Sequence, residues 1–213
     1  MQPQAAYVAF VVGYRQKFNY LFRTIKDLDE FLAPLENAIR FKFIPSLCDG
    51  RHCNDTERKI LALPTKSGGL GIINVFEEAK FQYETSYAAT SSLRDRIVTQ
   101  SEEPVDFENA MKIIRSRKKN RQGDYNNTIQ AVQPHLTPIE RKALEISMSP
   151  GAYAWLTTLP LKEEHYILNK QEFFDAIFTR YGWTMRRLPA TCACHENFTI
   201  EHALSWWFHH STP

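Results

Sequence analysis

Helix-start signals recur along this glycine-poor chain and constrain its fold more than any other feature. A capping box pairs an Asn or Thr N-cap with a Glu three residues later, and the pattern occurs at Asn54–Glu57, Thr137–Glu140 and Asn169–Glu172. Only 8 of the 213 residues are glycine, about half the usual share of ~7%. Because a turn-rich β fold needs more glycine, the sequence predicts a mainly α chain whose helices are joined by proline-marked turns.

Apolar residues spaced three and four apart place the helices along the chain. The predicted helices cover residues 5–23, 28–45, 54–62, 75–92, 105–122, 138–149, 152–159 and 169–181. Pro34 is expected to kink the second helix or to mark its late start, and Gly123-Asp124 is expected to end the fifth. The glycine cluster at 68–71 is expected to be a structural turn that leads into a short strand or extended piece at Ile72-Ile73.

Length and composition allow one domain or two small ones. Apolar residues make up 43% of the chain and aromatic residues 13%, which is enough side-chain volume to build a core. Residues 99–104 have the composition of a linker. We therefore expect a helical domain over residues 1–98, a second helical domain over 105–188, and a small cysteine-containing tail over 189–213.

The net charge is close to neutral, so an electrostatic binding site has to be local. The chain has 26 basic and 24 acidic residues, a formal charge of +2. Six cations fall within ten residues with no acid among them: Lys112, Arg115, Arg117, Lys118, Lys119 and Arg121. Such a run can neutralise nucleic-acid phosphates. The alternative is a solvated helix end, where cations are stabilised by the helix dipole.

The sequence Cys192-x-Cys194 followed by His202 resembles a zinc knuckle, because thiolate and imidazole are the ligands that zinc prefers. A closed tetrahedral site needs a fourth ligand, and Trp206 stands where that ligand is expected. Indole cannot coordinate a metal through its N–H. His195, His209 or His210 remain alternatives, although none has the expected spacing. The cofactor expectation is therefore zinc, held by Cys192, Cys194 and His202.

Cys48, His52 and Cys53 form a weaker cluster, for which a turn packed under helices is the simpler account. Four cysteines in 213 residues are too few for a disulfide scaffold. The apolar run from Ala5 to Val12 has no preceding basic residue and no cleavage site, so a secretory signal is not expected. No run reaches the length of a membrane span. These features favour a reduced, intracellular protein with no membrane partner.

Motifs of the common enzyme classes are missing from the sequence. It contains no phosphate-binding loop ending in Gly-Lys-Ser/Thr, no dinucleotide-binding glycine pattern, no His-Glu-x-x-His and no Gly-x-Ser-x-Gly. It also has no adjacent aspartate pair of the kind that holds catalytic magnesium in template-copying polymerases. The sequence therefore predicts neither a small-molecule substrate nor a catalytic residue.

The order of several short blocks resembles the region downstream of the polymerase palm in reverse transcriptases of retrotransposons without long terminal repeats. These blocks are Tyr7-Val8-Ala9-Phe10, Phe18-Asn19-Tyr20-Leu21, Leu35-Glu36-Asn37-Ala38-Ile39-Arg40, Leu63-Pro64-Thr65, Gly68-Gly69-Leu70-Gly71-Ile72, Ala154-Trp155-Leu156-Thr157, Leu159-Pro160, Arg180-Tyr181-Gly182-Trp183, and Cys192-x-Cys194 with Glu201-His202-Ala203-Leu204. They cover nearly the whole chain in order. The Leu-Pro and Gly-Gly-Leu-Gly-Ile blocks, and the Tyr-Gly-Trp and Cys-x-Cys blocks, are the more specific ones.

The resemblance implies a thumb-like helical domain over residues 1–98, a helical linker domain, and a degenerate Cys-Cys-His-Cys knuckle. In such enzymes the thumb grips the primer–template duplex beside the palm. The family's catalytic aspartates are missing here, and Trp206 replaces the last cysteine. The resemblance thus implies a non-catalytic fragment with residual binding of primer–template or element RNA, whose other partner would be the palm of a parent polyprotein.

Two other functional hypotheses compete with this one. The first is a helical protein-interaction module, in which the aromatic faces of the first helix and of residues 169–183 dock a partner. The second is a zinc-dependent enzyme, which lacks an acid or base placed beside the Cys-x-Cys pair. Palm codons beside the gene would favour the reverse-transcriptase interpretation.

Overall fold

The computed structural model describes residues 2–102, 104–185, 188, 190–192 and 194–199. It divides into two units, Met1–Gly182 and Trp183–Pro213. The α-helices of the first unit are α1 (Pro3–Val8), α2 (Asn19–Thr24), α3 (Asp29–Ala38), α4 (Ile44–Leu47), α5 (Asp55–Ala62), α6 (Val75–Ala89), α7 (Ser91–Thr99), α8 (Phe107–Val132), α9 (Pro138–Ser147), α10 (Ala154–Thr157) and α11 (Lys170–Tyr181). No β-strand occurs in the described part of the chain, so the predicted mainly α fold class is confirmed.

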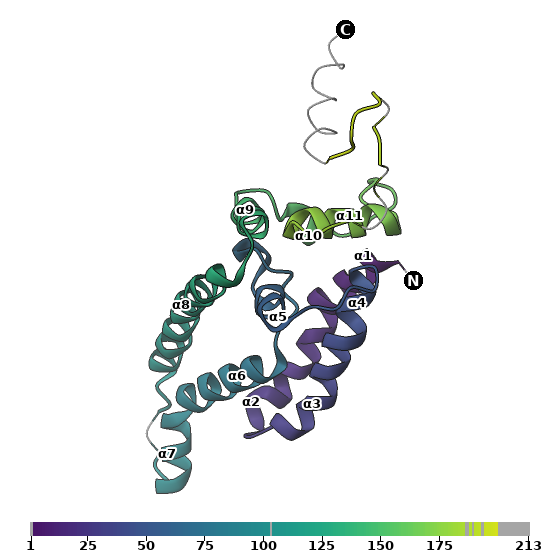
Figure 1. The fold of residues 1–213 in the computed structure, drawn as a ribbon. Coiled ribbons are helices and arrows are strands. Elements are labelled where there is room, and N and C mark those ends of the chain that lie inside the picture. The colour runs from purple at the N-terminus through teal and green to yellow at the C-terminus, as the bar shows by residue number, and fades with distance from the viewer. Residues whose placement is uncertain (1, 103, 186–187, 189, 193, 200–213) are drawn as a thin grey trace. The chain divides into compact units, whose positions relative to one another are not determined.

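The first 47 residues form a helical hairpin. A π turn and a 3₁₀ segment join α1 to α2, and a second π turn over Ile39–Phe43 joins α3 to α4, so two long helical arms lie side by side (Figure 1). The rings of Phe10 and Phe43 pack across the hairpin, 4.6 Å between centroids. The second arm continues past Pro45 instead of ending there, because the π turn before Pro45 changes the hydrogen-bond register where the proline ring would clash.

Pro34 lies inside α3, so the proline does not mark a late helix start. The helix begins at Asp29, after Leu28, and has no side-chain cap. Asp27 and Asp29 are both residues of a type that can cap a helix, but Asp27 lies in the turn before the helix with a φ of 54° and Asp29 is already helical.

The glycine cluster is a tight turn that returns the chain along the end of α5. Gly68 has a φ of +86°, and a Cβ placed on Gly69 would lie 1.9 Å from the carbonyl oxygen of Leu63. Leu70 and Ile72 each donate a backbone hydrogen bond to Leu61 at 3.2 Å, and both are fully buried. Of the two expected alternatives, a short strand or an extended piece, the structure shows an extended segment, because it pairs with a helix end and not with another strand.

A buried ion pair fixes this segment to the hairpin. Arg58 of α5 donates to both carboxylate oxygens of Glu36 at 2.7 and 3.0 Å, and its remaining N–H groups bond the carbonyls of Ile72 and Ile73, each at 2.8 Å. Glu36 also accepts from the backbone N–H of Val75, the first residue of α6. One arginine thus connects α3, α5, the extended segment and the start of α6.

Helix α8 is longer than expected, and the predicted break at Gly123-Asp124 is wrong. It begins at the Asp106 N-cap and runs through Gly123 to Val132. A glycine inside a helix costs only about 1 kcal/mol relative to alanine, and the packing of α8 on α5 and α6 offsets that cost. Helices α7 and α8, which flank the connection over residues 100–106, both belong to the first unit. The expected domain limits at this connection stay predictions.

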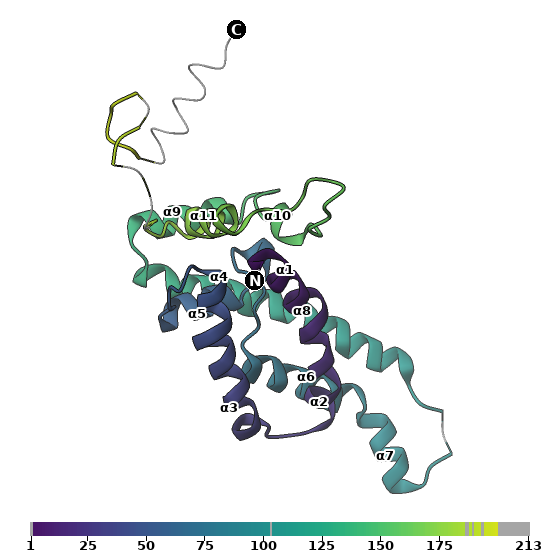
Figure 2. The same ribbon diagram turned by 90° about the vertical axis from the view of Figure 1, so that its right-hand side faces the viewer.

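The other capped helices begin where predicted. Capping boxes are present at Asn54, Thr137 and Asn169, and the Asn74 side chain caps α6. The predicted helix over 75–92 is broken at Thr90 into α6 and α7, and α10 covers only part of 152–159. Both views show α9, α10 and α11 together at one end of the first unit, next to α1 (Figures 1 and 2).

Arg180 joins this group of helices to the glycine turn. Its side chain is buried and donates to the carbonyls of Thr65, Gly69 and Ala152. The helix that carries it, α11, ends at Gly182, whose φ is +65°. None of the described helices combines the length and the hydropathy needed to cross a bilayer.

Candidate nucleic-acid interface and neighbouring pocket

The six cations of residues 112–121 lie on α8, but they do not form one face. Successive residues of an α-helix are turned by about 100°, so Arg117 and Arg121 point away from Arg115, Lys118 and Lys119. Arg117 forms a salt bridge with Glu84 at 3.3 Å, and Arg121 forms one with Glu78. Both acids belong to α6, so two of the six expected phosphate ligands hold α8 against α6 instead.

The Glu78–Arg121 pair lies at the core of this contact. Both carboxylate oxygens of Glu78 accept from the guanidinium, and Gln82 donates to the same carboxylate at 2.8 Å. Burial alone would raise the pKa of Glu78, but Arg121 outweighs it and the pKa is lowered. Burial would likewise lower the pKa of Arg121, while the bond to Glu78 raises it. The Arg121 guanidinium also lies over the ring of Phe81, 4.1 Å from its centroid.

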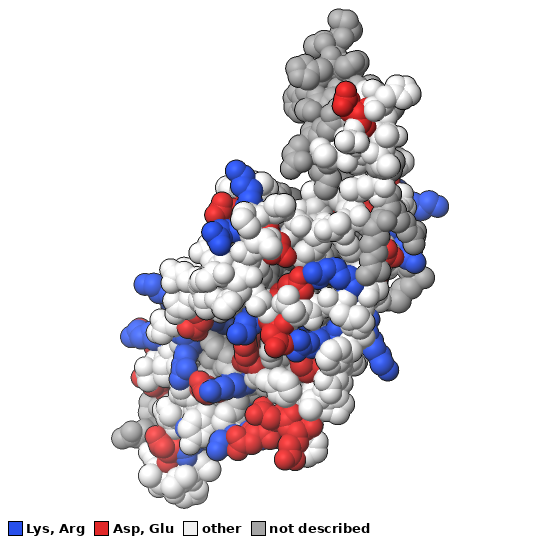
Figure 3. Space-filling view, viewed as in Figure 1, with Lys and Arg blue, Asp and Glu red and all other residues white. Residues whose placement is uncertain are grey.

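The opposite face of α8 carries the exposed cations. Arg115, Lys118 and Lys119 are exposed, and no salt bridge joins them to the residues that the structure describes. Lys112 lies on the same face but pairs with Glu108 at 2.9 Å, four residues earlier. Blue side chains lie along the edge that α8 forms in Figure 3, whereas red ones gather at the turn before α3. We call Arg115, Lys118 and Lys119 the outer cation face.

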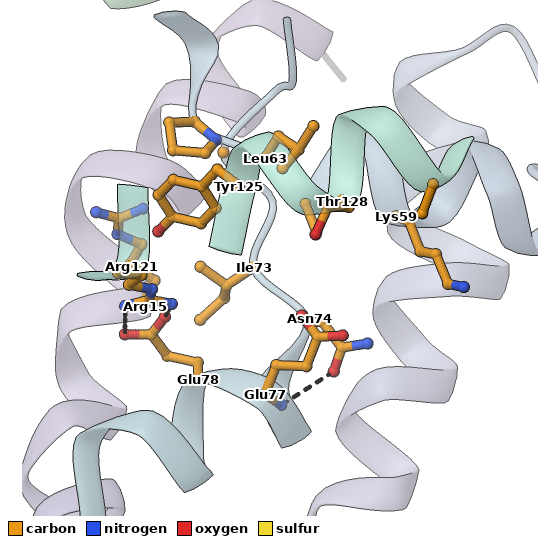
Figure 4. Close-up of a pocket in the computed structure, with 14 residues that line it drawn as sticks. Arg15, Lys59, Leu63, Ile73, Asn74, Glu77, Glu78, Arg121, Tyr125 and Thr128 are labelled. Atoms are coloured by element: carbon orange, nitrogen blue, oxygen red, sulfur yellow. Dashed lines mark hydrogen bonds and ion pairs between the residues drawn. The ribbon is translucent and has the colours of Figure 1, made fainter. Parts of the chain in front are cut away.

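A pocket of about 400 Å³ lies beside the inner face of α8. Its floor is formed by the end of α5 and the extended segment, with Leu63 and Ile73 among its apolar residues. Figure 4 shows Arg15, Arg121, Glu78 and Tyr125 together at one end. Lys59 and Thr128 lie at the other end in the same view. No motif in the sequence marks this pocket.

Arg15 distinguishes the pocket from an ordinary gap between helices. Its side chain is half-buried, yet it makes no hydrogen bond, ion pair or ring contact with any residue in the described ranges. Other half-buried arginines of those ranges bond a carboxylate or carbonyl or stack on a ring, as Arg121, Arg96 and Arg94 do. No sequence signal singles out Arg15, since a second cation, Lys17, lies two residues later in the same stretch.

The Cys-x-Cys segment forms a tight turn in the second unit. Thr191 and Asn197 form an isolated antiparallel bridge. Cys192 donates its backbone N–H to the carbonyl of Glu196 at 2.8 Å, and His195 donates to the carbonyl of Cys192 at 2.9 Å. Cys192 and Cys194 are both half-exposed. Two soft donors on one turn fit half of a zinc site.

The predicted third and fourth positions of that site, His202 and Trp206, lie outside the described residues. Within the described ranges no group of three or more His, Cys, Asp or Glu side chains is placed to hold a metal. The zinc site therefore stays a prediction. By contrast, Cys48 and Cys53 are buried, and burial raises the pKa of the Cys48 thiol to about 12. A protonated thiol is a poor metal ligand, which argues against a metal site here. Both side chains are instead part of the buried core.

The aromatic side chains of α11 are also part of the core. Phe173, Phe174, Phe178 and Tyr181 are all buried. They are therefore not available as the docking face that the protein-interaction hypothesis expected over residues 169–183. The first helical arm does expose aromatic side chains, with Tyr20 75% exposed.

Comparison with known proteins adds no family assignment to this geometry. No protein-family model, no curated protein and no solved structure matches the chain. What remains for a functional argument is the exposed cation face, the pocket behind it, and the resemblance carried by the short sequence blocks.

Proposed function

We propose that this protein is a non-catalytic nucleic-acid-binding helical module that contacts phosphates through the outer cation face of α8. One observation carries the proposal. Arg115, Lys118 and Lys119 stay exposed without a salt bridge in the described chain, while Arg117 and Arg121 of the same run are neutralised by Glu84 and Glu78. The surface thus retains positive charge where the sequence concentrates it.

The spacing of these three residues suits a phosphate backbone. Side chains three and four positions apart on a helix have Cβ atoms about 5–6 Å apart. Successive phosphates of a single strand lie at a comparable distance, and each neutralised phosphate releases a counterion. The contacts are to phosphate and not to bases, so the expected binding shows little sequence preference.

The family resemblance supports the same kind of partner. The block order from Tyr7-Val8-Ala9-Phe10 through Leu63-Pro64-Thr65 resembles that of the thumb region, which holds a primer–template duplex in retrotransposon reverse transcriptases. We therefore expect an RNA–DNA duplex or element RNA as the partner, and no polymerase activity, since the family's aspartate motif is not in this sequence.

A binding experiment with a charge-matched control tests the proposal. In fluorescence anisotropy with a labelled RNA–DNA duplex, the variant with Arg115, Lys118 and Lys119 changed to glutamine should bind about tenfold or more weakly than the wild type. The control changes three exposed lysines on other elements, Lys17, Lys42 and Lys162, to glutamine. Equal losses in the two variants would show that only total charge matters and would overturn the assignment to α8.

A further inference from the structure

The pocket behind α8 holds an excess of positive charge at one end. Arg121 and Glu78 neutralise each other through their two hydrogen bonds. Arg15 lies close enough to both Glu78 and Tyr125 to lower their pKa values. Because Glu78 is already held by Arg121, the Arg15 guanidinium has no acceptor of its own in the described residues. A half-buried guanidinium without a hydrogen-bond acceptor loses part of its hydration, and the charge of Glu78 is already shared with Arg121, so the site favours an added anion.

Tyr125 supplies a second unused donor at the same end. Its hydroxyl makes no hydrogen bond within the described ranges, and Figure 4 shows it directed toward the end that holds Arg15 and Arg121. Burial raises the pKa of Tyr125, more than Arg121 lowers it, so the phenol keeps its proton at neutral pH and can donate it. Donors from two different helical elements thus lie at the same end of the pocket. A tetrahedral oxyanion has three terminal oxygens to accept from them, whereas a planar carboxylate has two.

The rest of the pocket is suited to an organic group. Its volume of about 400 Å³ is in the usual range for small-molecule sites. The floor is apolar, with Ala62, Leu63 and Ile73, while Asn74 and Thr128 add polar groups farther from Arg15. An inorganic anion alone would leave most of this space to water.

We propose that this pocket binds a phosphomonoester, with the phosphate on Arg15 and Tyr125 and its organic group over Leu63 and Ile73. The site is separate from the outer cation face, because Arg15 belongs to the first helical arm and Arg121 points to the other side of α8. Such a phosphate occurs on a free nucleotide-sized metabolite and also at the 5′ end of a nucleic-acid strand.

Isothermal titration of the full chain with adenosine 5′-monophosphate tests this site. The wild type should show one saturable site for the monophosphate and much weaker binding of adenosine, inorganic phosphate and benzoate. The Arg15→Gln variant should bind the monophosphate at least about tenfold more weakly, the loss expected for a charge-assisted hydrogen-bonded contact. Tyr125→Phe, which keeps the ring, should cause a smaller loss.

Lys17→Gln is the matched control, since it removes one positive charge from an exposed position on the same helical segment as Arg15, outside the pocket, and should leave the affinity unchanged. Arg15 makes no hydrogen bond with the described residues, so its replacement should leave the circular dichroism spectrum unaltered. Equal weakening in Arg15→Gln and Lys17→Gln, or binding of adenosine or benzoate as tight as that of the monophosphate, would overturn the proposal.

Competition separates the two sources of the phosphate. Displacement of the bound monophosphate by a 5′-phosphorylated oligonucleotide, but not by the same strand without its phosphate, assigns the site to a strand end. Displacement by neither assigns it to a free metabolite.

Discussion

Gly69 and Gly123 show how much the role of one residue type depends on its surroundings. A Cβ on Gly69 would collide with the backbone of Leu63, so this glycine is required by the close approach of two chain segments. Gly123 lies within α8, and a Cβ there would meet nothing within 4 Å. The sequence marks both positions as breaks, but only the first of them is one.

The two glycines therefore give opposite predictions. Gly69→Ala should lower the free energy of unfolding by several kcal/mol, because a clash with backbone atoms cannot be relieved by a side-chain rotation. Gly123→Ala should raise it by about 0.5–1 kcal/mol, the difference in helix propensity. Urea unfolding followed by circular dichroism measures both changes. Destabilisation by Gly123→Ala would contradict the uninterrupted α8.

Arg58 is the residue whose loss should be costliest among the ion pairs. Arg58→Met leaves the Glu36 carboxylate buried without its partner, and we expect a loss of about 3–5 kcal/mol. Asp55→Asn, the control, breaks the exposed Arg40–Asp55 pair and should cost at most about 1 kcal/mol. Chemical denaturation of the two variants makes the comparison, and similar costs would argue against a central role for the Arg58 network.

At the scale of elements, the sequence predicts helix starts well and helix ends less well. Asn54, Thr137 and Asn169 carry their caps in neighbouring residues, so local chemistry places those starts. The length of α8 depends on packing against α5 and α6, which a local glycine signal does not reveal. The same holds for the cation run. Glu84, the acid that pairs with Arg117, lies 33 residues earlier in the sequence, so no local pattern reveals the pair. Helical periodicity alone does place Arg117 and Arg115 on different faces of the helix.

The α6–α8 contact predicts a pH dependence of stability. The folded state lowers the pKa of Glu78 from 4.5, so the contribution of this carboxylate is present above pH 4.5 and is lost as the pH falls through the folded pKa. The gap in the free energy of unfolding between the wild type and Glu78→Gln should therefore be largest near pH 7 and shrink in acid. A gap that stays constant down to pH 3 would contradict this role.

The Cys-x-Cys turn predicts a weak metal site. If Cys192, Cys194 and His202 are the protein ligands, a fourth position is left to water, and the affinity for zinc should rise strongly in Trp206→Cys. A competitive titration with a chromophoric zinc chelator measures both proteins. Equal affinities would mean that another residue, such as His195, already completes the site.

At the scale of the whole molecule, the helical fold carries two positively charged places, the outer cation face and the pocket, on opposite sides of α8. The fold class was predictable because helix periodicity and caps are local properties. The pocket was not, because Arg15, Tyr125 and Ile73 come from three distant parts of the chain. The sequence shows that residues 112–121 are rich in cations. Which of these cations stay exposed depends on the ion pairs that α8 forms with α6.

The salt dependence of duplex affinity shows whether the outer cation face of α8 contacts phosphates. The logarithm of the association constant, measured against the logarithm of salt concentration between 50 and 200 mM, falls with a slope of about 0.9 per phosphate contacted on a B-form duplex. Changing Arg115, Lys118 and Lys119 to glutamine should reduce that slope by about 2–3, and the Lys17, Lys42 and Lys162 control should leave it unchanged. An unchanged slope in the α8 variant would return these residues to the role of a solvated helix surface and contradict the proposed function.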